Sequence, residues 1–542
     1  MFFRLAVFVG LSSVVATIIY LTPIPEQIFL SCDRPCHHLD WPMICRLKLT
    51  LEVFQSLSKS CGDCPQNETA CLSDHCVSAD GQRRGILTAN RQLPGPIIQV
   101  CENDILVVDV INRIPGKTAA MHWRGQTQIE TPHMDGAPLV TQCPIPSYTT
   151  FQYKFRASSA GTHLWHAHAG ADVTNGIFGA LIVKQADIKD PHRALYDIDD
   201  SDHVVLVSQW QHSTEITFTD GHAKPAILLV NGRGRQPNGP NVPLTRFTVI
   251  PGRRHRFRVA NAGGAGSCPI TISVDAHPLL LIALDGQPVE PRQIASITLA
   301  KGERADFVLK ANKRVASYWM NVYTSKECAI SPISGAAILE YKGSSTKDPL
   351  PVTEATEQSE VEEVRVAMTT NPAAKCENPE SLCVTELHAL RKIPAALGKP
   401  KTDVTIRLPI NYKLQTNDIV GGLDDLVYHL HGYTFYVVGA RKFGRSVSLH
   451  ELKSLDDRGQ LFSRNLDCTV AKDTVVVPKF GAVALRFKAD NPGYWILRDE
   501  HAAEWTRGLD VILQVGQTSD MVPAPEDFPK CGSFVGPDYF LI

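Results

Sequence analysis

The sequence predicts an all-β protein made of three β units in series. Short runs of β-branched and aromatic residues recur along the chain with turn residues between them, a pattern typical of an antiparallel sandwich or barrel and not of alternating strands and helices. The length of 542 residues suits about three or four domains of roughly 150 residues each. At residues 343–363 the composition shifts to Ser, Thr, Pro and Glu, which indicates an interdomain linker.

The expected strands fall into three groups, one for each unit. The units are placed at residues 81–190, 200–342 and 364–520, and a C-terminal tail follows at 521–542. In the first unit the expected strands are 97–101, 105–111, 148–157, 162–168 and 179–183. In the second they are 204–209, 226–230, 245–250, 255–261, 271–274, 279–284 and 304–309. In the third they are 404–408, 433–438, 474–477, 482–488, 494 onward and 510–515.

The N-terminal residues 1–21 have the layout of a secretory signal, with Arg4 in front of a mostly apolar run. An uncleaved signal anchor is the alternative, because the run is near the short end of a membrane span and lacks an Ala-x-Ala site. In both cases the rest of the chain lies outside the cytosol. We therefore expect a secreted protein, with membrane attachment only through an uncleaved anchor.

A cysteine-rich segment at residues 32–80 fits this location. Cys61-Gly-Asp-Cys64 could be read as a redox or zinc pair, but disulfides are the better interpretation in a chain with a secretory signal. The chain has 15 cysteines, an odd number, so at least one is free or paired between chains. Asn67-Glu-Thr69 is a glycosylation sequon and predicts a surface loop. The seven cysteines of the segment are Cys32, Cys36, Cys45, Cys61, Cys64, Cys71 and Cys76.

The strand expected after Gly493 contains three consecutive charges. Its first residues are large and apolar on both faces, as in a strand buried inside a domain, and Arg498, Asp499 and Glu500 follow. Alternation places Arg498 and Glu500 on one face and Asp499 on the other. Such charges are costly to bury unless they are paired or have replaced something else.

Paired polar residues, mostly histidines, occur at a spacing of two in other expected strand regions. Residues two apart share a face of a strand, and imidazole is a common ligand of copper, zinc and iron. A single pair is more often hydrogen-bonded or on the surface, but five such histidines in an extracellular β protein indicate a metal centre. The motifs are His122-Trp-Arg124, His166-Ala-His168 and His429-Leu-His431.

These motifs, in their surroundings, resemble the copper motifs of multicopper oxidases, and most closely those of insect-type laccases. The similarity covers most of the chain from Cys32 onward. It implies three cupredoxin-like Greek-key domains. It also implies a type 1 copper in the third domain, which takes electrons from a phenol, diamine or metal ion, and a trinuclear cluster, which reduces dioxygen to water. The matching stretches are 91–96, 122–126, 134–136, 140–145, 161–168, 229–234, 428–433 and 491–495, together with the cysteine-rich segment.

The resemblance also assigns the ligand positions, and only some of them are kept. His122 and His429 match type 2 ligands, and His166, His168 and His431 match type 3 ligands. The replaced positions are Arg124, Leu426, Arg498, Asp499, Glu500 and Glu504, and Leu509 is at the axial position.

A type 1 site needs a thiolate and two imidazoles, and this chain offers Asp499, Glu504 and Leu426 instead. We therefore expect that this site is lost. Two alternatives remain for the cluster. In the first, Arg124 and Arg498 form a buried polar network with Glu500 in place of the copper ions. In the second, one copper or zinc ion is bound by the five histidines.

The resemblance further implies two disulfides, Cys101 with Cys531 and Cys143 with Cys268. It suggests a laccase-like protein similar to the insect multicopper-oxidase-related proteins, without oxidase activity, that binds an extracellular protein or small molecule in a binding or signalling role. No cofactor is required by this interpretation. The alternatives are a residual copper-dependent oxidoreductase and a structural or copper-binding protein. The net charge of −2 and the absence of a Lys/Arg run give no reason to expect nucleic acid.

Overall fold

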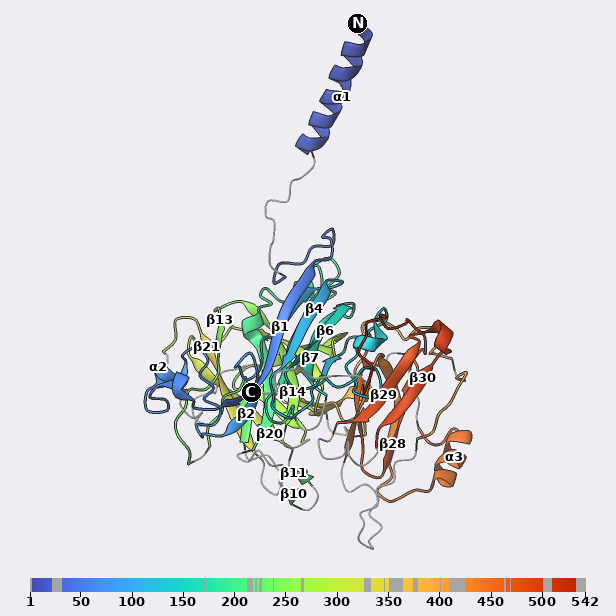
Figure 1. Cartoon of the computed structure of the whole chain (residues 1–542). Helices are drawn as coiled ribbons and strands as arrows, with labels where there is room; N and C mark the ends of the chain where they lie inside the picture. The colour runs from blue at the N-terminus through green and yellow to red at the C-terminus, as the bar shows by residue number, and fades with distance from the viewer. Residues whose placement is uncertain are drawn as a thin grey trace.

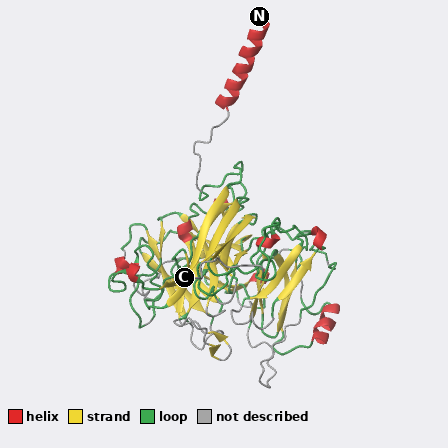
Figure 2. Ribbon diagram, in the orientation of Figure 1, coloured by secondary structure: helices red, strands yellow, loops and turns green. Residues whose placement is uncertain are grey.

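The computed structural model is dominated by β-strands, with a few short helices at the edge of the body (Figure 2). Helix α1 (Phe2–Leu21) stands apart from the β body (Figure 1). Among the described residues, no helix combines the length and apolar character needed to cross a membrane. The structure describes residues 2–21, 32–168, 172–211, 218–219, 222–223, 227–236, 238–264, 268–325, 333–345, 347–349, 364–373, 379–399, 401–408, 425–462, 465–467, 469–500 and 509–532.

The first unit consists of two four-stranded sheets. In β1 the side chains alternate, so that Cys45, Leu49 and Leu51 are buried while Arg46 and Lys48 are exposed. The aromatic side chains of the two sheets meet in one core. One sheet has the order β2 (Gly85–Ala89), β1 (Ile44–Gln55), β4 (Ile105–Asn112) and β6 (Thr149–Arg156), and the other has β3 (Ile98–Cys101), β8 (Phe178–Lys184), β7 (Gly161–Ala167) and β5 (Met121–Arg124).

The second unit has a six-stranded and a seven-stranded sheet, which enclose the largest core of the molecule. Two strands that lie after residue 364 in the sequence, β22 and β23, extend the seven-stranded sheet. The first sheet has the order β12 (Ile227–Val230), β9 (Val204–Trp210), β14 (Arg254–Gly264), β19 (Arg304–Lys310), β16 (Leu279–Leu284) and β17 (Gln287–Ile294). The second has β13 (Arg246–Val249), β21 (Ser334–Tyr341), β20 (Ser317–Thr324), β15 (Ile270–Val274), β18 (Ser296–Leu299), β22 (Ala367–Thr369) and β23 (Ser381–Cys383).

The third unit has a four-stranded and a three-stranded sheet, and its orange and red strands lie beside the blue and cyan strands of the first unit (Figure 1). One sheet has the order β27 (Thr474–Val477), β24 (Leu426–Leu430), β29 (Gly493–Asp499) and β30 (Val511–Val515). The other has β26 (Ala471–Lys472), β25 (Phe435–Lys442) and β28 (Gly481–Arg486). Short elements elsewhere are α2 (Glu68–Cys71), α3 (Leu449–Asp457) and the hairpin of β10 (Phe218–Thr219) and β11 (His222–Ala223).

The predicted all-β class is confirmed, with two differences in detail. The strand expected at residues 404–408 is wrong: these residues form no strand, and Val404 and Ile406 have exposed fractions of 75% and 63%. The sheets are mixed and not purely antiparallel, since β1 pairs with β4 and β9 with β14 in parallel. Parallel pairing becomes possible because these neighbours are not consecutive in the chain: β2 and β3 lie between β1 and β4 in the sequence, and β3 belongs to the other sheet of the unit.

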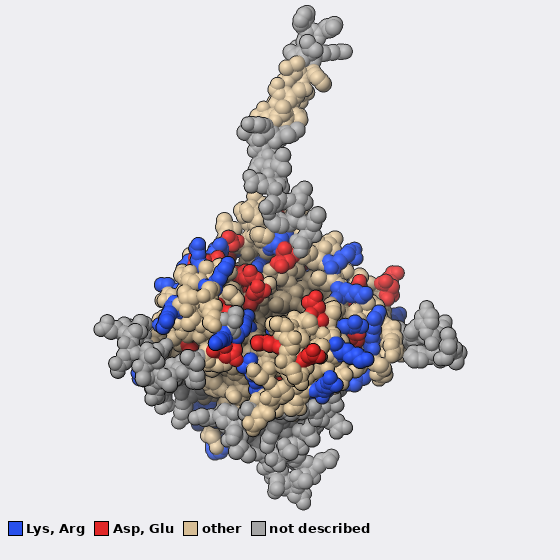
Figure 3. All heavy atoms as spheres, turned by 90° about the vertical axis from the view of Figure 1, so that its left-hand side faces the viewer, with Lys and Arg blue, Asp and Glu red and all other residues tan. Residues whose placement is uncertain are grey.

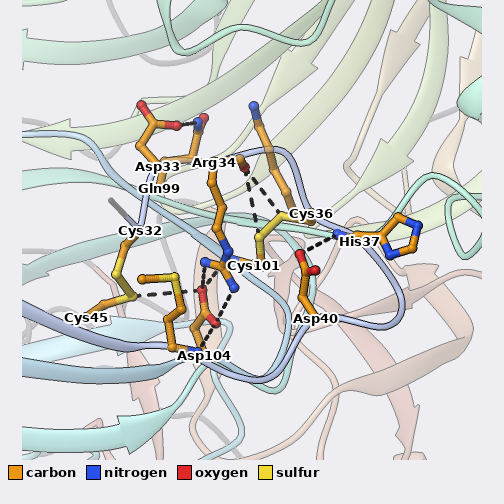
Figure 4. The surroundings of a disulfide bond; sticks show 12 residues. Cys32, Asp33, Arg34, Cys36, His37, Asp40, Cys45, Gln99, Cys101 and Asp104 are labelled. Carbon is orange, nitrogen blue, oxygen red and sulfur yellow. Dashed lines mark hydrogen bonds and ion pairs between the residues drawn. A yellow bond between two sulfur atoms is a disulfide. The ribbon is translucent and has the colours of Figure 1, made fainter. Parts of the chain in front are cut away.

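Both disulfide pairings expected from the resemblance are wrong. Cys101 pairs with Cys36, with their Cα atoms 5.5 Å apart, because the loop after Cys32 lies against the end of β3 (Figure 4). Cys143 pairs with Cys531, so the C-terminal segment is tied to the first unit through a different cysteine. Cys268 is also in a disulfide, but not with Cys143.

The cysteine-rich segment is held by disulfides, as predicted. Three of them lie within the segment: Cys32–Cys45, Cys61–Cys76 and Cys64–Cys71. Beside the first, the Arg34 guanidinium donates to both carboxylate oxygens of the buried Asp104, at 2.7 and 2.9 Å (Figure 4). Asn67 is exposed at the start of α2, where its side-chain oxygen accepts from the Thr69 backbone N–H. Glycosylation at Asn67 stays a prediction.

Candidate functional site

Strand alternation in the first unit turns polar side chains toward the third unit. Along β5, Met121 and Trp123 pack into the core of the first unit, so His122 and Arg124 point to the opposite face. The register of β5 and β7 places His166 directly across from His122. All four residues of β5 are buried, which means that the polar face is covered as well as the apolar one.

The third unit presents a matching face. Along β24, Tyr428 and Leu430 belong to the core of the third unit, and His429 points away from it. β29 runs beside β24, with Arg498 across from His429 and Asp499 across from Tyr428. The predicted alternation in β29 is therefore observed: Arg498 lies on the face toward the first unit and Asp499 on the other.

The five retained histidines meet where these faces come together. The ring centroid of His122 is 3.8 Å from that of His431, 5.3 Å from those of His168 and His429, and 5.5 Å from that of His166. Each of the five has an exposed fraction of 9% or less. The structure thus collects side chains from two units that are about 300 positions apart, since His122 and His429 are separated by 307 residues.

Four of the five imidazoles hold Nδ1 against an oxygen that can only accept a hydrogen bond. We therefore assign the proton to Nδ1, which leaves a lone pair on Nε2. Histidines that bind metals through one ring nitrogen commonly donate from the other in this way. The contacts are His122 to Asp135 O at 2.8 Å, His166 to Ala167 O at 2.9 Å, His429 to Asp473 O at 2.9 Å and His431 to Asp135 Oδ2 at 2.7 Å.

The Nε2 lone pairs converge. Nε2 of His122 and Nε2 of His429 are 3.1 Å apart, a separation at which two lone pairs repel unless a proton or a metal ion lies between them. Nε2 of His166 and Nε2 of His431 are buried without a hydrogen-bond partner among the described residues. One nitrogen from each of His122, His429 and His431 lies within 4.8 Å of the others. These three residues fit one metal ion.

Burial favours the neutral form of four imidazoles of the site, those of His166, His168, His429 and His431. Burial lowers the pKa of His431 to about 3 and lowers the pKa of His429, with the Arg124 charge adding to the effect on His429. Burial also holds the pKa values of His166 and His168 well below the usual range. Burial alone would raise the pKa of Asp135, but the imidazoles of His431 and His122 lower it far below normal, so this carboxylate is ionised.

Arg124 forms an ion pair inside the expected cluster. Its NH1 group donates to Glu500 Oε1 at 2.9 Å, and its NH2 group donates to Thr474 Oγ1 at 2.8 Å. The ammonium of Lys301 donates to the backbone carbonyl of Glu500. Burial opposes ionisation of Glu500, but the charges of Arg124 and Lys301 hold its pKa well below the usual value. A carboxylate and two cations thus occupy this part of the site.

Arg498 takes a different partner from Arg124. Its NH1 group lies 3.0 Å from Nδ1 and 3.2 Å from Nε2 of His168, and it also reaches the backbone carbonyl of His168 at 3.5 Å. The expected polar network with Glu500 is therefore two separate contacts. Glu500 pairs with Arg124, and Arg498 contacts the imidazole of His168. Both ring nitrogens of His168 therefore lie next to a cation, unlike those of the other four histidines.

The positions matched to a type 1 copper do not fit that ion. Leu426 offers no donor atom and packs against the core of the third unit. Asp499 is buried with a carboxylate where a thiolate is needed, and its backbone N–H donates to Asp510 Oδ1 at 3.2 Å. Tyr428 donates its hydroxyl to the backbone carbonyl of Leu509 at 3.3 Å. Glu504 lies outside the described residues.

A wider set of buried charged residues around the site was not predicted from the sequence. The Arg304 guanidinium of the second unit donates to Asp473 Oδ1 of the third unit at 2.7 Å. The Lys472 ammonium lies 2.9 Å from Asp285 and 3.1 Å from Glu303. These charges join the second unit to the third. The signal available in the sequence was the pair Lys472 and Asp473 directly before an apolar strand.

Comparison with known proteins agrees with this architecture. Family models described as multicopper oxidase match residues 72–187, 200–344 and 410–516. The chain is 30% identical to Laccase-2 of Pleurotus ostreatus over 482 residues, which covers 80% of this chain and 84% of that protein. It is 28% identical to Laccase-4 of Thanatephorus cucumeris over 81% of this chain and 87% of that protein.

Solved structures show the same fold. The laccase from Botrytis aclada superposes with a TM-score of 0.63 at 22% identity, covering 89% of both chains. Fet3p, described as a multicopper oxidase that functions in iron import, superposes with a TM-score of 0.62 at 18% identity, covering 87% of this chain and 90% of that one. With three cupredoxin-like domains in series and family models over most of its length, the chain belongs to the multicopper oxidase family.

The family implies copper, and this site fits it only in part. Three closely spaced copper ions would lie beside Arg124 and Arg498, and buried cations at such distances repel metal ions strongly. A full trinuclear cluster therefore does not fit the residues present. The converging Nε2 atoms of His122, His429 and His431 fit a single ion.

Proposed function

We propose that this protein is an extracellular, laccase-like binding protein that does not catalyse the oxidase reaction. The observation that carries the proposal is the ion pair between Arg124 and Glu500 inside the expected copper cluster. A permanent cation and its carboxylate fill space and charge that copper ions would need. The type 1 positions also lack the thiolate through which electrons would enter, because Asp499 is a carboxylate.

The disulfides support a location outside the cytosol. Five disulfides join described cysteines, and one of them ties Cys531 to Cys143 across 388 positions. Disulfides of this kind form and persist in oxidising compartments. A secreted form, or a form attached through an uncleaved N-terminal segment, is consistent with the apolar residues 2–21.

The proposed partner is an extracellular protein or small molecule, in a binding or signalling role. On the face shown in Figure 3, basic and acidic side chains are interspersed, and neither sign covers the face alone. Neither this face nor the net charge of −2 points to nucleic acid as the partner.

The activity test is oxygen consumption by the purified full chain with phenol and diamine substrates, after copper has been supplied. The result that we expect is no consumption beyond that of free copper in buffer. Substrate-dependent oxygen consumption that stays with the protein after unbound copper has been removed by gel filtration would refute the proposal. This separation matters because free copper itself oxidises phenols.

A second candidate function is the binding of one metal ion without turnover. The specific observation in its favour is the 3.1 Å contact between the Nε2 atoms of His122 and His429, each of which is left with a lone pair by its Nδ1 contact. In this arrangement the metal would be held by His122, His429 and His431.

Equilibrium titration with copper and with zinc tests this candidate. One ion per chain is expected for the wild type, with a loss of affinity of at least about tenfold when His429→Gln removes a ligand nitrogen. His163→Gln is the matched control, because His163 is a buried histidine of the same unit as His122 that contacts Ser159 instead of the cluster. A His166→Gln/His168→Gln double variant shows whether the ion uses the other pair.

A further inference from the structure

The loop between Cys36 and Cys45 presents large apolar side chains to solvent. Trp41 has an exposed fraction of 89%, the highest among the large apolar residues that the structure describes, and Leu39 has 74%. Ile44, the first residue of β1, has 58%. We call residues 37–44 the apolar loop, which projects at the top of the body in Figure 1. Large apolar side chains in water gain free energy wherever a partner covers them.

The apolar loop is held in place by the body of the first unit. The Asp104 carboxylate accepts from the Met43 backbone N–H at 2.7 Å. Within the loop, the Asp40 carboxylate accepts from the His37 backbone N–H at 3.1 Å (Figure 4). The disulfides that fix both ends are Cys32–Cys45 and Cys36–Cys101. The outward position of the apolar side chains is therefore part of the framework of the unit.

Basic side chains lie on the sheet face next to the apolar loop. Alternation along β1 puts Arg46 on the same exposed face as Ile44. The strand register sets Lys154 of β6 in line with Arg46, with one residue of β4 between them. Neither cation forms an ion pair with another described residue. Asp33 and Asp40 bring negative charge to the segment before β1, so attraction to anions comes from the sheet face.

A lipid surface fits this combination better than a folded partner. A standard protein interface involves about 20–30 residues on each side, whereas the apolar loop offers three exposed large apolar side chains. A bilayer takes up such side chains without a shaped partner, and the ring of Trp favours the level of the headgroups. The chain from Leu21 to Cys32 spans at most about 40 Å when fully extended. An uncleaved segment 2–21 held in a membrane would therefore keep the loop near it.

We propose that the apolar loop docks the protein on the surface of a phospholipid bilayer. Trp41 and Leu39 enter the interface between headgroups and acyl chains, and Arg46 and Lys154 lie near phosphate groups. The proposal goes beyond the proposed function and does not depend on it, because none of these residues belongs to the histidine site. It applies to the chain with residues 2–21 and to the chain without them.

Quenching of tryptophan fluorescence by brominated phospholipids tests the proposal on the full chain. Vesicles of phosphatidylcholine and phosphatidylserine with bromine on the acyl chains quench an indole ring only where it reaches those chains. We expect quenching relative to the same vesicles without bromine, and loss of most of it in Trp41→Phe. No quenching of the wild type, or equal quenching in Trp41→Phe, overturns the proposal. Four further tryptophans are buried and out of reach of the lipid: Trp123, Trp165, Trp210 and Trp495.

A matched pair of leucine variants assigns the contact to the apolar loop. Leu39→Ser should weaken vesicle binding about tenfold, because the burial of one leucine side chain is lost. Leu139→Ser is the control, since Leu139 is 77% exposed in a turn of the same unit. Where residues 2–21 are retained and hold every variant on the vesicle, the quenched fraction at saturating lipid is compared in place of the affinity. Equal behaviour of the two variants overturns the proposal.

A second matched pair tests the cations. Arg46→Gln/Lys154→Gln should reduce the same measure about tenfold at low salt, and high salt should remove the difference. Arg253→Gln/Lys310→Gln is the control, because it removes two exposed cations of the second unit. Equal behaviour of the two double variants overturns the contact with phosphate groups. Copper content and oxygen consumption do not enter these outcomes, so this inference and the proposed function fail separately.

Discussion

Arg124 is buried to an exposed fraction of 1%, and its charge is balanced by one contact with Glu500 and supported by one with Thr474. A charge in this position is stable only while its partner is present, because the protein interior solvates an isolated ion poorly. Gly302 packs against the guanidinium so closely that a Cβ atom there would lie 2.3 Å from NH2 of Arg124. The surrounding structure is thus shaped around an arginine.

Removal of one member of this pair should therefore destabilise the protein strongly. We predict that Arg124→Met lowers the free energy of unfolding by about 3–5 kcal/mol, since it leaves the Glu500 carboxylate buried and unpaired. The double variant Arg124→Met/Glu500→Gln should recover part of this loss, because both charges are then gone. Chemical denaturation of the two single variants and the double variant gives the coupling. The predicted pairing would be contradicted if the double variant lost as much free energy of unfolding as the two single variants lose together.

The strand β29 holds its apolar and its charged residues on defined faces. Trp495 and Leu497 stay in the core of the third unit, while Arg498 turns toward the first unit and Asp499 away from it. Gly432, just after β24, has a φ of +74°, and a Cβ atom there would lie 2.3 Å from the Trp495 ring. The close approach of Gly432 to Trp495 therefore helps to hold β29 against β24.

The C-terminal segment depends on a covalent link. We predict that Cys143→Ser/Cys531→Ser lowers the free energy of unfolding by about 2–4 kcal/mol, since this disulfide closes a very long loop and restricts the unfolded chain. The single variant Cys531→Ser should cost as much as the double variant, because either change breaks the same bond. Thermal and denaturant unfolding under non-reducing conditions measures both. Wild-type stability in the double variant would show that the link is dispensable.

The units of the molecule are joined by buried charges as well as by apolar contacts. Arg304 of the second unit reaches Asp473 of the third and the Thr162 carbonyl of the first, at 2.7 and 3.1 Å. Asp473 also accepts from the hydroxyl of Thr474, which in turn contacts Arg124. The site is therefore continuous with the ion pairs that hold the units together, which supports a structural role for the replaced copper positions.

Buried neutral histidines outside the site should make the protein less stable in mild acid. Burial lowers the pKa values of His163, His255 and His277 to about 4, below the unfolded value of about 6.5. Between these values the unfolded chain binds more protons than the folded one, so stability falls as the pH decreases from about 6.5 to 4. Each histidine contributes a slope of up to about 1.4 kcal/mol per pH unit.

Denaturant unfolding at several pH values across this window measures the slope. His163→Gln should reduce it, because one titrating group is removed while a side chain able to donate to the Ser159 carbonyl remains. A free energy of unfolding that is constant over the window, or an equal slope in the variant, would contradict the prediction.

Strand positions and the convergence of the five histidines could be predicted, because alternation and motif spacing are local properties of the sequence. Partners that depend on three-dimensional packing could not. Nothing in the spacing shows that Arg498 covers His168 while Arg124 takes Glu500. Cysteine connectivity is likewise not contained in sequence positions, and the pairing of Cys101 with Cys36 follows from how the N-terminal loop lies on β3.

The most direct test of whether this laccase fold has lost its oxidase chemistry is a joint measurement of copper content and oxygen consumption. The protein for this test is produced with copper supplied. We predict at most one copper ion per chain, held by His122, His429 and His431, and no oxygen consumption with a phenol or diamine. Three or four copper ions per chain, with substrate-dependent oxygen consumption, would contradict the replacement of the copper centre by the Arg124–Glu500 and Arg498–His168 contacts.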